Sequence, residues 1–359
     1  MPRFRLSSFL LVLVLGFHLQ SLSGAQLVPG WDEIKPGGDT SCARGDDFSF
    51  FVAPGQSDKI VIDFIGGGAC WDGKTCDKPT KTFVDTVDDV REHYQRGLEG
   101  IYNRNRADNP LRQWTHIVIP YCTGDIHWGA HDVAYTNENG QEFTIRHRGA
   151  INAKAVLNWV KEHFSTPNRV LVTGCSAGAY GSIYWTPEVV KNYPQARVVQ
   201  FADSGEGVVT DNFFQDSFPQ WNPTLHAPNW VPGLDPRSND WQSLTLVDLY
   251  QRIGHYLPGV RLGEFSSAYD GIQTFFFEIM GGDPEVWAPG MRHHLKNVSD
   301  DLGEQYRYYV SQGEEHCILP YERFYTTTSG PQQQRFSTWF ESFVEEKEIS
   351  NIDCGDHCD

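Results

Sequence analysis

Basic residues are scarce in this chain, and their scarcity argues against several classes of function. The 359 residues carry 29 Lys and Arg against 46 Asp and Glu, which gives a formal net charge of −17 at pH 7. Such an excess of negative charge repels phosphate backbones and anionic membrane surfaces. The sequence therefore predicts neither a nucleic-acid partner nor an electrostatic contact with a membrane.

Long hydrophobic runs, internal repeats and low-complexity linkers are also missing beyond the first 25 residues. Within residues 1–25, Arg3 and Arg5 precede a short apolar stretch from Leu10 to Phe17, and Ser23-Gly24-Ala25 places small residues at a cleavage point. This pattern is typical of a secretory signal peptide, and the apolar stretch is shorter than the roughly 20 residues of a membrane anchor.

The rest of the chain, residues 26–359, is predicted to be a single secreted domain with no membrane anchor. All eight cysteines lie there, and an even number in an exported chain favours disulfides. Cys70 and Cys76 are close enough for a local pair, as are Cys354 and Cys358, but spacing alone does not fix the pairing. Nothing in the sequence indicates an oligomeric state.

Four short apolar runs are typical of buried parallel strands, and a helical pattern lies between the second and the third. The runs are Lys59–Ile65, His116–Tyr121, Arg169–Thr173 and Arg197–Phe201. From Gly149 to Phe164, apolar residues recur every three or four positions, as they do on an amphipathic helix. Strands that alternate with helices predict an α/β fold, with a mostly parallel sheet flanked by helices.

The pattern changes between about residues 212 and 245. This segment is rich in proline, contains Trp221, Trp230 and Trp241, and has no clear period. We interpret it as a cap-like insertion over the active-site face of the same domain, with a plain surface loop as the alternative.

The most specific motif is Gly174-Cys175-Ser176-Ala177-Gly178, which has the form G-x-S-x-G. A β-branched run precedes it, and a segment from Ala179 to about Tyr193 that can be helical follows it. A strand, a sharp turn through small residues and a helix form the nucleophile elbow of an α/β-hydrolase. Ser176 is therefore the predicted nucleophile.

A serine hydroxyl needs a base, and the base needs an acid that orients it. In this fold the three residues follow the chain order Ser, Asp or Glu, His. His316 is the best base, because it lies in the loop after the strand-like run Tyr306–Ser311. Two acids compete: Asp270 follows the later of two strand-like stretches, which is the usual place, and Asp203 follows the earlier. If Asp270 is the acid, Asp203 stabilises its own loop, supports the catalytic histidine or lines the cleft.

Stabilisation of the oxyanion requires backbone amides. Gly66-Gly67-Gly68 follows an apolar strand, as the glycine-rich oxyanion loop of esterases does. Gly67, Gly68 and Ala177 are the predicted donors. A phosphate-binding loop would continue with Lys and Ser or Thr, whereas this one continues with Ala69-Cys70-Trp71. This chemistry requires no metal ion and no cofactor.

These motifs together resemble the pectin acetylesterase family, which also contains the Notum-type deacylases. The resemblance is carried by Gly66–Trp71, Ile119–Asp125, Gly174–Ala179, Ala202–Gly205 and the pair His316-Cys317. It implies a secreted serine esterase of α/β-hydrolase type. It also implies a triad on Ser176, Asp270 and His316 and oxyanion donors on Gly67, Gly68 and Ala177.

The chain departs from the family pattern near the predicted cleft. Gly178-Ala179 stands where many relatives have two glycines, and Gly68 stands where Notum-type proteins have a tryptophan. Trp71 and Trp128 are candidates for an aromatic cleft wall that stacks on a sugar or holds an acyl chain.

The expected function is that of a secreted serine carboxylesterase that removes acyl groups, above all acetyl, from a carbohydrate such as pectin. One alternative is a Notum-like deacylase of a lipid-modified protein or of a longer acyl ester, and another is a catalytically silent extracellular binding protein. Because pectin is a polyanion, its binding would require local cations. The candidates are Arg104, Arg106, Arg112, Arg146 and Arg148.

Overall fold

The computed structural model describes residues 26–28, 30–88, 90–91 and 99–358. The predicted signal peptide, residues 1–25, lies outside the described residues. Within them, none of the helices combines the length and the apolar character needed to cross a bilayer.

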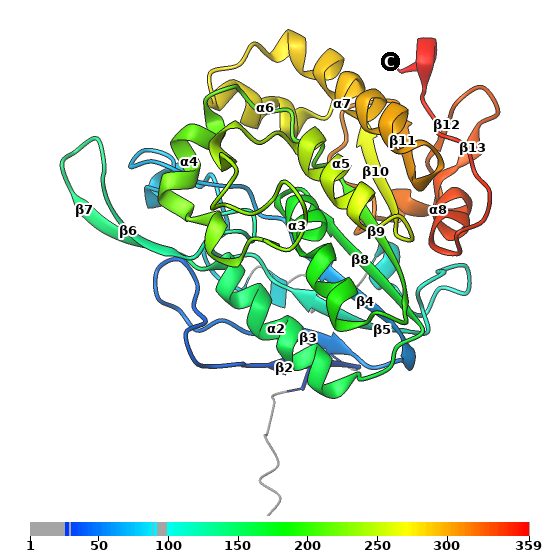
Figure 1. Cartoon of the computed structure of the whole chain (residues 1–359), viewed down its shortest axis with the longest axis horizontal. Coiled ribbons are helices and arrows are strands. Elements are labelled where there is room, and N and C mark those ends of the chain that lie inside the picture. Colours follow the sequence, from blue (N-terminus) through cyan, green and yellow to red (C-terminus); the bar gives the residue numbers. More distant parts are fainter. Residues whose placement is uncertain (1–25, 29, 89, 92–98, 359) are drawn as a thin grey trace, which may run out of the picture.

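A nine-stranded sheet forms the centre of the molecule (Figure 1). In spatial order its strands are β1 (Gln26–Val28), β2 (Trp31–Ile34), β3 (Phe50–Ala53), β5 (Trp114–Ile119), β4 (Gln56–Phe64), β8 (Arg169–Cys175), β9 (Arg197–Asp203), β10 (Arg261–Ser267) and β11 (Tyr306–Ser311). From β5 to β11 all neighbouring strands are parallel, whereas β1, β2 and β3 pair antiparallel at one edge. The predicted mostly parallel sheet is confirmed.

Each of the four predicted apolar runs became a strand of this sheet, namely β4, β5, β8 and β9. All six residues of β5 are buried, which explains why its sequence shows no alternation of apolar and polar residues. Because carboxyl ends of parallel strands share one edge, the residues that follow β4, β8, β9, β10 and β11 are brought to the same side of the molecule.

Helices cover both faces of the sheet. They are α2 (Gly149–His163), α3 (Ala177–Asn192), α4 (Phe213–Trp221), α5 (Leu246–Tyr256), α6 (Gly271–Ile279), α7 (Trp287–Leu302) and α8 (Phe336–Val344). Buried residues of α2, α3, α4, α5 and α7 share one hydrophobic cluster with Ile60 and Ile62 of β4. Val61, which points to the opposite face, belongs to a second cluster with Trp339 and Phe343 of α8. The sheet therefore lies between two hydrophobic layers.

The helical predictions hold with small shifts at the ends. α2 matches the predicted amphipathic helix, and α3 begins at Ala177, two residues earlier than expected.

Away from the main sheet, β6 (His131–Thr136) and β7 (Glu142–His147) form a hairpin that projects from the body (Figure 1). β12 (Thr328–Ser329) and β13 (Gln334–Arg335) form a small second hairpin.

Four disulfides pair all eight cysteines. The pairs are Cys42–Cys122, Cys70–Cys76, Cys175–Cys317 and Cys354–Cys358. The two local pairs are those that spacing suggested, whereas the two long-range pairs join segments 80 and 142 residues apart.

Candidate active site

Ser176 occupies a strained turn between β8 and α3. Its backbone has φ 58° and ψ −124°, a conformation that non-glycine residues rarely adopt. Its N–H donates to the carbonyl of Asp203 at the end of the neighbouring strand, with an N···O distance of 2.8 Å. A Cβ on Gly178 would lie 1.8 Å from the carbonyl oxygen of Phe64, so only glycine fits this close approach. The local backbone is the predicted elbow.

His316 is held by Asp270. The imidazole Nδ1 lies 2.8 Å and 3.0 Å from the two carboxylate oxygens, and Asp270 is fully buried. Asp270 is also the N-cap of α6, where it accepts the backbone N–H groups of Ile272 and Gln273, each at 3.0 Å. Because a carboxylate only accepts, Nδ1 is the donor in this contact, and in the tautomer that has its single proton on Nδ1 the lone pair is on Nε2.

The other nitrogen of this imidazole makes no hydrogen bond within the described chain. His316 Nε2 is also buried. His316 and Ser176 both line the same hollow in the surface. A neutral imidazole with a free lone pair beside a serine is the arrangement that a general base requires.

Asp203 has a different position from the one a triad acid needs. Its buried carboxylate accepts the backbone N–H groups of Ile318 and Leu319, at 2.9 Å and 2.8 Å. Burial raises the pKa of Asp203 to about 6, although these two hydrogen bonds oppose the shift. Asp203 thus anchors the loop directly after His316, while its carbonyl holds Ser176.

A disulfide joins the immediate neighbours of the serine and the histidine. Cys175 precedes Ser176, Cys317 follows His316, and their sulfur atoms are bonded. The N–H of Cys317 also donates to Ser204 Oγ at 3.0 Å, and both residues have φ 58°. Three non-glycine residues with positive φ, Ser176, Ser204 and Cys317, therefore meet at one point, which shows that the surrounding contacts over-determine the backbone there.

The loop after β4 lies directly against the nucleophile. A Cβ on Gly66 would lie 2.7 Å from the Cβ of Ser176. Within the described chain, the N–H groups of Gly67 and Gly68 donate to no other residue, while the Gly67 carbonyl accepts from Val84 at 2.8 Å. Amides that are free beside a serine are suited to receive an oxyanion.

The hollow beside Ser176 has an apolar lining that the sequence did not predict. Its volume is about 520 Å³ including the open mouth. Besides the serine, histidine and glycine-loop residues, the lining includes Ile126, Tyr180, Val208, Phe213, Ile272, Gln273, Phe276 and Met280. The sequence signal for the α6 residues is the aromatic run Phe275–Phe277, which begins five residues after Asp270.

A second buried carboxyl, that of Glu206, lies close to Asp270. Gln273 uses one amide nitrogen to donate to Asp270 Oδ2 at 3.2 Å and to Glu206 Oε2 at 2.7 Å. Burial raises the pKa of Glu206 well above its usual value, and the nearby carboxylate of Glu264 raises it further. Gln273 therefore bridges Asp270 and a second carboxyl, Glu206, whose charged form is disfavoured by burial.

Trp71 and Trp128 do not face the hollow. Both are buried, and neither belongs to its lining. The Trp128 indole donates to the carbonyl of Tyr180 at 2.9 Å and stacks on Tyr184, while Trp71 packs edge-on against Phe213. They therefore support lining residues from below and do not form the predicted aromatic wall.

The segment of residues 212–245 contributes one side of the hollow. Phe213, at the start of α4, belongs to the lining. Trp221 and Trp241 are buried and belong to the hydrophobic cluster that contains α3. Trp221 and Trp241 thus pack the segment against the rest of the fold, and Phe213 is its residue in the lining of the hollow.

The arginines considered for an anionic substrate lie elsewhere. None of the five lines the hollows around Ser176. Arg106 pairs with Asp108, and Arg148 pairs with Asp132. Arg112 lines a separate hollow with Trp114, at the start of β5.

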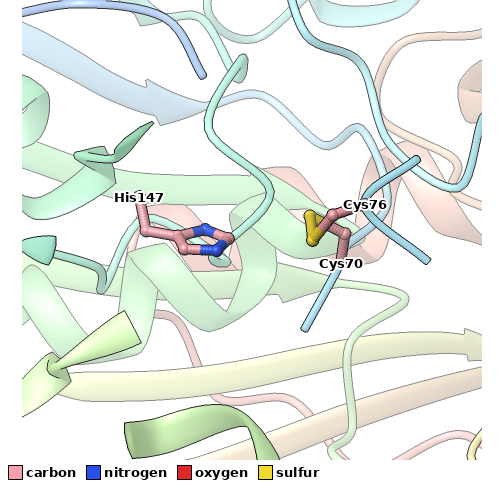
Figure 2. A group of neighbouring side chains, drawn as sticks. All are labelled: Cys70, Cys76 and His147. Carbon is pink, nitrogen blue, oxygen red and sulfur yellow. A yellow bond between two sulfur atoms is a disulfide. The ribbon is translucent and has the colours of Figure 1, made fainter. Parts of the chain in front are cut away.

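Three side-chain groups in the described chain bring metal-ligand types together, but disulfides use their cysteines. Figure 2 shows one of them, in which Cys70 and Cys76 are bonded to each other beside His147. Both nitrogens of His147 are engaged, with Tyr135 Oη at 2.9 Å and the Thr123 carbonyl at 3.0 Å. Burial lowers the pKa of this histidine to about 3, so it is a neutral core residue.

Comparison with known proteins gives a structural neighbour and a family match. The chain is similar in structure to the Wnt deacylase Notum from Drosophila, with a TM-score of 0.63 over 89% of this chain and 96% of that one. Their sequence identity is 16%, so this likeness shows the α/β-hydrolase-like fold alone. Comparison with curated proteins gives no sequence match.

The family model for pectinacetylesterase matches residues 36–221, which is just over half of the chain. The matched range includes Ser176, the glycine loop and Asp203, whereas Asp270 and His316 lie beyond it. Their place in the site therefore rests on the geometry described above. The chain belongs to the pectinacetylesterase family.

Proposed function

We propose that this protein is a secreted serine carboxylesterase that removes acyl groups, above all acetyl, from a carbohydrate. The observation that carries the proposal is the state of His316: Nδ1 is bound to buried Asp270, and Nε2 is free beside Ser176. Family membership supports an ester substrate. The four disulfides support an oxidising, extracellular location.

In the proposed reaction, Ser176 Oγ attacks the ester carbonyl and its proton passes to His316 Nε2. The amides of Gly67, Gly68 and Ala177 stabilise the negative charge that develops on the carbonyl oxygen. His316 then gives the proton to the departing sugar hydroxyl, which leaves an acyl group on Ser176. Water, deprotonated by the same nitrogen, releases the carboxylic acid and restores the serine.

The apolar lining also suits a longer acyl chain, which is the second candidate. Val208, Phe213 and Met280 offer a hydrophobic surface next to Ser176. A volume of about 520 Å³, much of it open, fits a short acyl group with room for part of a sugar. The acyl length that the hollow accepts separates an acetylesterase from a lipid deacylase.

The test is the hydrolysis of p-nitrophenyl esters from acetate to palmitate. We expect the highest kcat/KM with acetate, and we expect Ser176→Ala and His316→Ala each to lower kcat by at least about 10³-fold. Ser165→Ala is the matched control, since that serine is exposed in the turn after α2. A maximum at long chains would replace the acetylesterase by the lipid deacylase.

The two aspartates provide an internal control. Asp270→Asn removes the charge that orients His316, so kcat should fall by about 10³- to 10⁴-fold with the fold intact. Asp203→Asn weakens the hydrogen bonds to Ile318 and Leu319, so its main effect should be a loss of about 1–3 kcal/mol of stability. The reverse pattern would transfer the orienting role to Asp203. Turnover that does not depend on Ser176 would end the proposal of serine catalysis.

A further inference from the structure

A buried histidine outside the proposed triad contacts the start of the glycine loop. His127 is buried, and its Nε2 lies 2.8 Å from the carbonyl oxygen of Ile65, the residue that directly precedes Gly66-Gly67-Gly68. Because a carbonyl only accepts, Nε2 carries a proton and is the donor in this hydrogen bond. Burial lowers the pKa of His127 to about 4, so the ring is neutral at neutral pH and has a single N–H to donate.

This hydrogen bond matters because a loop of three glycines has no side chains that could hold it in place. At Gly66 a Cβ would lie 2.4 Å from a backbone oxygen at the end of β8, so the loop must lack side chains where it passes the serine. Its peptide groups are held through their carbonyls instead. The Ile65 carbonyl accepts from His127, and the Gly67 carbonyl accepts from the N–H of Val84 at 2.8 Å. The N–H of Gly67 lies between these two anchored peptides.

The backbone that carries His127 is strained. Ile126 and His127 have φ 52° and φ 65°, so two consecutive non-glycine residues adopt the left-handed conformation. The carboxylate of Asp125 accepts the N–H of His127 at 3.2 Å, and the indole of Trp185 donates to the His127 carbonyl at 3.0 Å. Strain of this kind persists where surrounding contacts over-determine the backbone, and it is common at functional sites. Here the turn places Ile126 in the lining of the hollow beside Ser176 and His127 at the start of the glycine loop.

The imidazole is enclosed by three further elements of the fold. Its ring centroid lies 5.1 Å from that of Phe64 in β4 and 5.0 Å from that of Tyr121, which follows β5. A Cβ on Gly181 of α3 would lie only 3.0 Å from His127 Cδ2. The ring therefore has little freedom to rotate away from the Ile65 carbonyl. A side chain that only filled this space would need no N–H.

We propose that His127 is a positioning residue for the oxyanion: by holding the Ile65 carbonyl, it keeps the Gly67 amide directed at the carbonyl oxygen of an ester bound at Ser176. This inference rests on the proposed esterase function. The described residues that line the hollows around Ser176 do not include His127, so it acts through the loop and not on the substrate. Because the oxyanion forms only after the ester is bound, loss of this hydrogen bond should lower kcat and leave KM nearly unchanged.

The distinguishing variants are His127→Phe and His127→Gln. Phenylalanine keeps an aromatic ring in the enclosed space but has no N–H, whereas the amide nitrogen of glutamine can donate from a position close to that of Nε2. For p-nitrophenyl acetate, we expect kcat to fall about 10- to 100-fold in His127→Phe, with KM within about threefold of the wild type. In His127→Gln, kcat should recover to within about threefold of the wild type.

His147→Phe is the matched control. His147 is also buried and also contacts a backbone carbonyl, that of Thr123 at 3.0 Å, but it is not among the described residues that line the hollows around Ser176. Thermal unfolding should show a loss of stability in His147→Phe as in His127→Phe, with kcat retained in the control. If His127→Phe does not fold, the smaller His127→Leu, which also lacks a donor, replaces it.

Hydrogen exchange provides a second measurement that does not depend on turnover. The exchange rate of the amides in residues 65–69 reports how firmly the loop backbone is held. Exchange there should be faster in His127→Phe than in the wild type and in His127→Gln. In His147→Phe, exchange in this segment should match that of the wild type.

A kcat for His127→Phe equal to that of the wild type would overturn the positioning role. An equal loss of kcat in His127→Phe and His127→Gln would also overturn it, because the N–H would then not be the group that matters. The same holds for an equal loss of kcat in His147→Phe, which would reduce the effect to stability. Ester hydrolysis that does not depend on Ser176 would instead end the proposed function, and hydrogen exchange would still decide whether His127 holds the loop.

Discussion

At the scale of single residues, the burial of the Glu206 carboxyl near Asp270 has a measurable consequence. An acid whose pKa is raised by burial stays protonated in the folded protein while it ionises in the unfolded chain. The free energy of unfolding therefore falls as the pH rises above about 4.3, the pKa of a glutamate in the unfolded chain. It falls by about 1.4 kcal/mol per pH unit, until Glu206 also ionises in the folded protein. Glu264 and Asp270, the acids near Glu206, add to the effect by repelling its charged form.

Glu206→Gln replaces the neutral acid by a neutral amide, whose oxygen can still accept from Gln273. We expect its free energy of unfolding to match that of the wild type near pH 4 and to exceed it increasingly between about pH 5 and 7. Chemical denaturation over this pH range measures the difference. Glu278→Gln, an exposed position on α6, should show no such trend. A difference that shrinks with rising pH would show that ionised Glu206 stabilises the fold.

Sequence reasoning at this scale predicted Ser176 as the nucleophile and His316 as the base but left two acids open. The reason is that Asp203 ends one strand, Asp270 follows the next, and both carboxylates lie near the loop that carries His316. Only the three-dimensional arrangement shows that one carboxylate meets the imidazole and the other meets the amides of Ile318 and Leu319. Trp71 and Trp128 were assigned to the cleft because of their type, whereas packing directs them into the core.

At the scale of elements, the turn from β8 into α3 leaves no room for a side chain at Gly178. An exchange of glycine for alanine in a helix normally stabilises it by about 0.5–1 kcal/mol. At Gly178 the new methyl group would lie 1.8 Å from the carbonyl oxygen of Phe64 in β4, so the sign should reverse. We expect Gly178→Ala to lose at least about 2 kcal/mol of stability and most of the ester turnover.

Gly259→Ala is the control, because a Cβ there would meet nothing within 4 Å. Its stability should stay within about 1 kcal/mol of the wild type. Both variants are compared by chemical denaturation and by p-nitrophenyl acetate hydrolysis. If Gly178→Ala has the same free energy of unfolding as Gly259→Ala, the gap between Gly178 and the Phe64 carbonyl is wide enough for a methyl group.

The elements themselves were largely predictable, since buried parallel strands and an amphipathic helix have distinct local patterns. The surroundings of the site were not, because they combine residues from distant segments. The apolar lining joins Ile126, Val208 and Met280, which no spacing relates. Likewise, the arginines singled out from the sequence lie elsewhere.

At the scale of the whole molecule, the two long-range disulfides have similar loop-closure entropies but join different parts of the fold. Cys42–Cys122 spans 80 residues and Cys175–Cys317 spans 142. Loop-closure entropy gives each of them a stabilisation of about 4.5–5 kcal/mol, against about 2 kcal/mol for Cys354–Cys358, which spans 4 residues. On stability alone, the two long-range bonds should therefore be nearly equivalent.

Their effects on turnover should differ, because only Cys175–Cys317 joins the neighbours of Ser176 and His316. Replacing Cys175 and Cys317 by alanine should lower kcat for p-nitrophenyl acetate by about 10²-fold, since a displacement of about 1 Å costs that much. The same change at Cys42 and Cys122 should destabilise the protein with kcat retained at temperatures where it is folded. Equal kcat in the two variants would show that Asp203, through its hydrogen bonds to both loops, suffices to hold serine and histidine together.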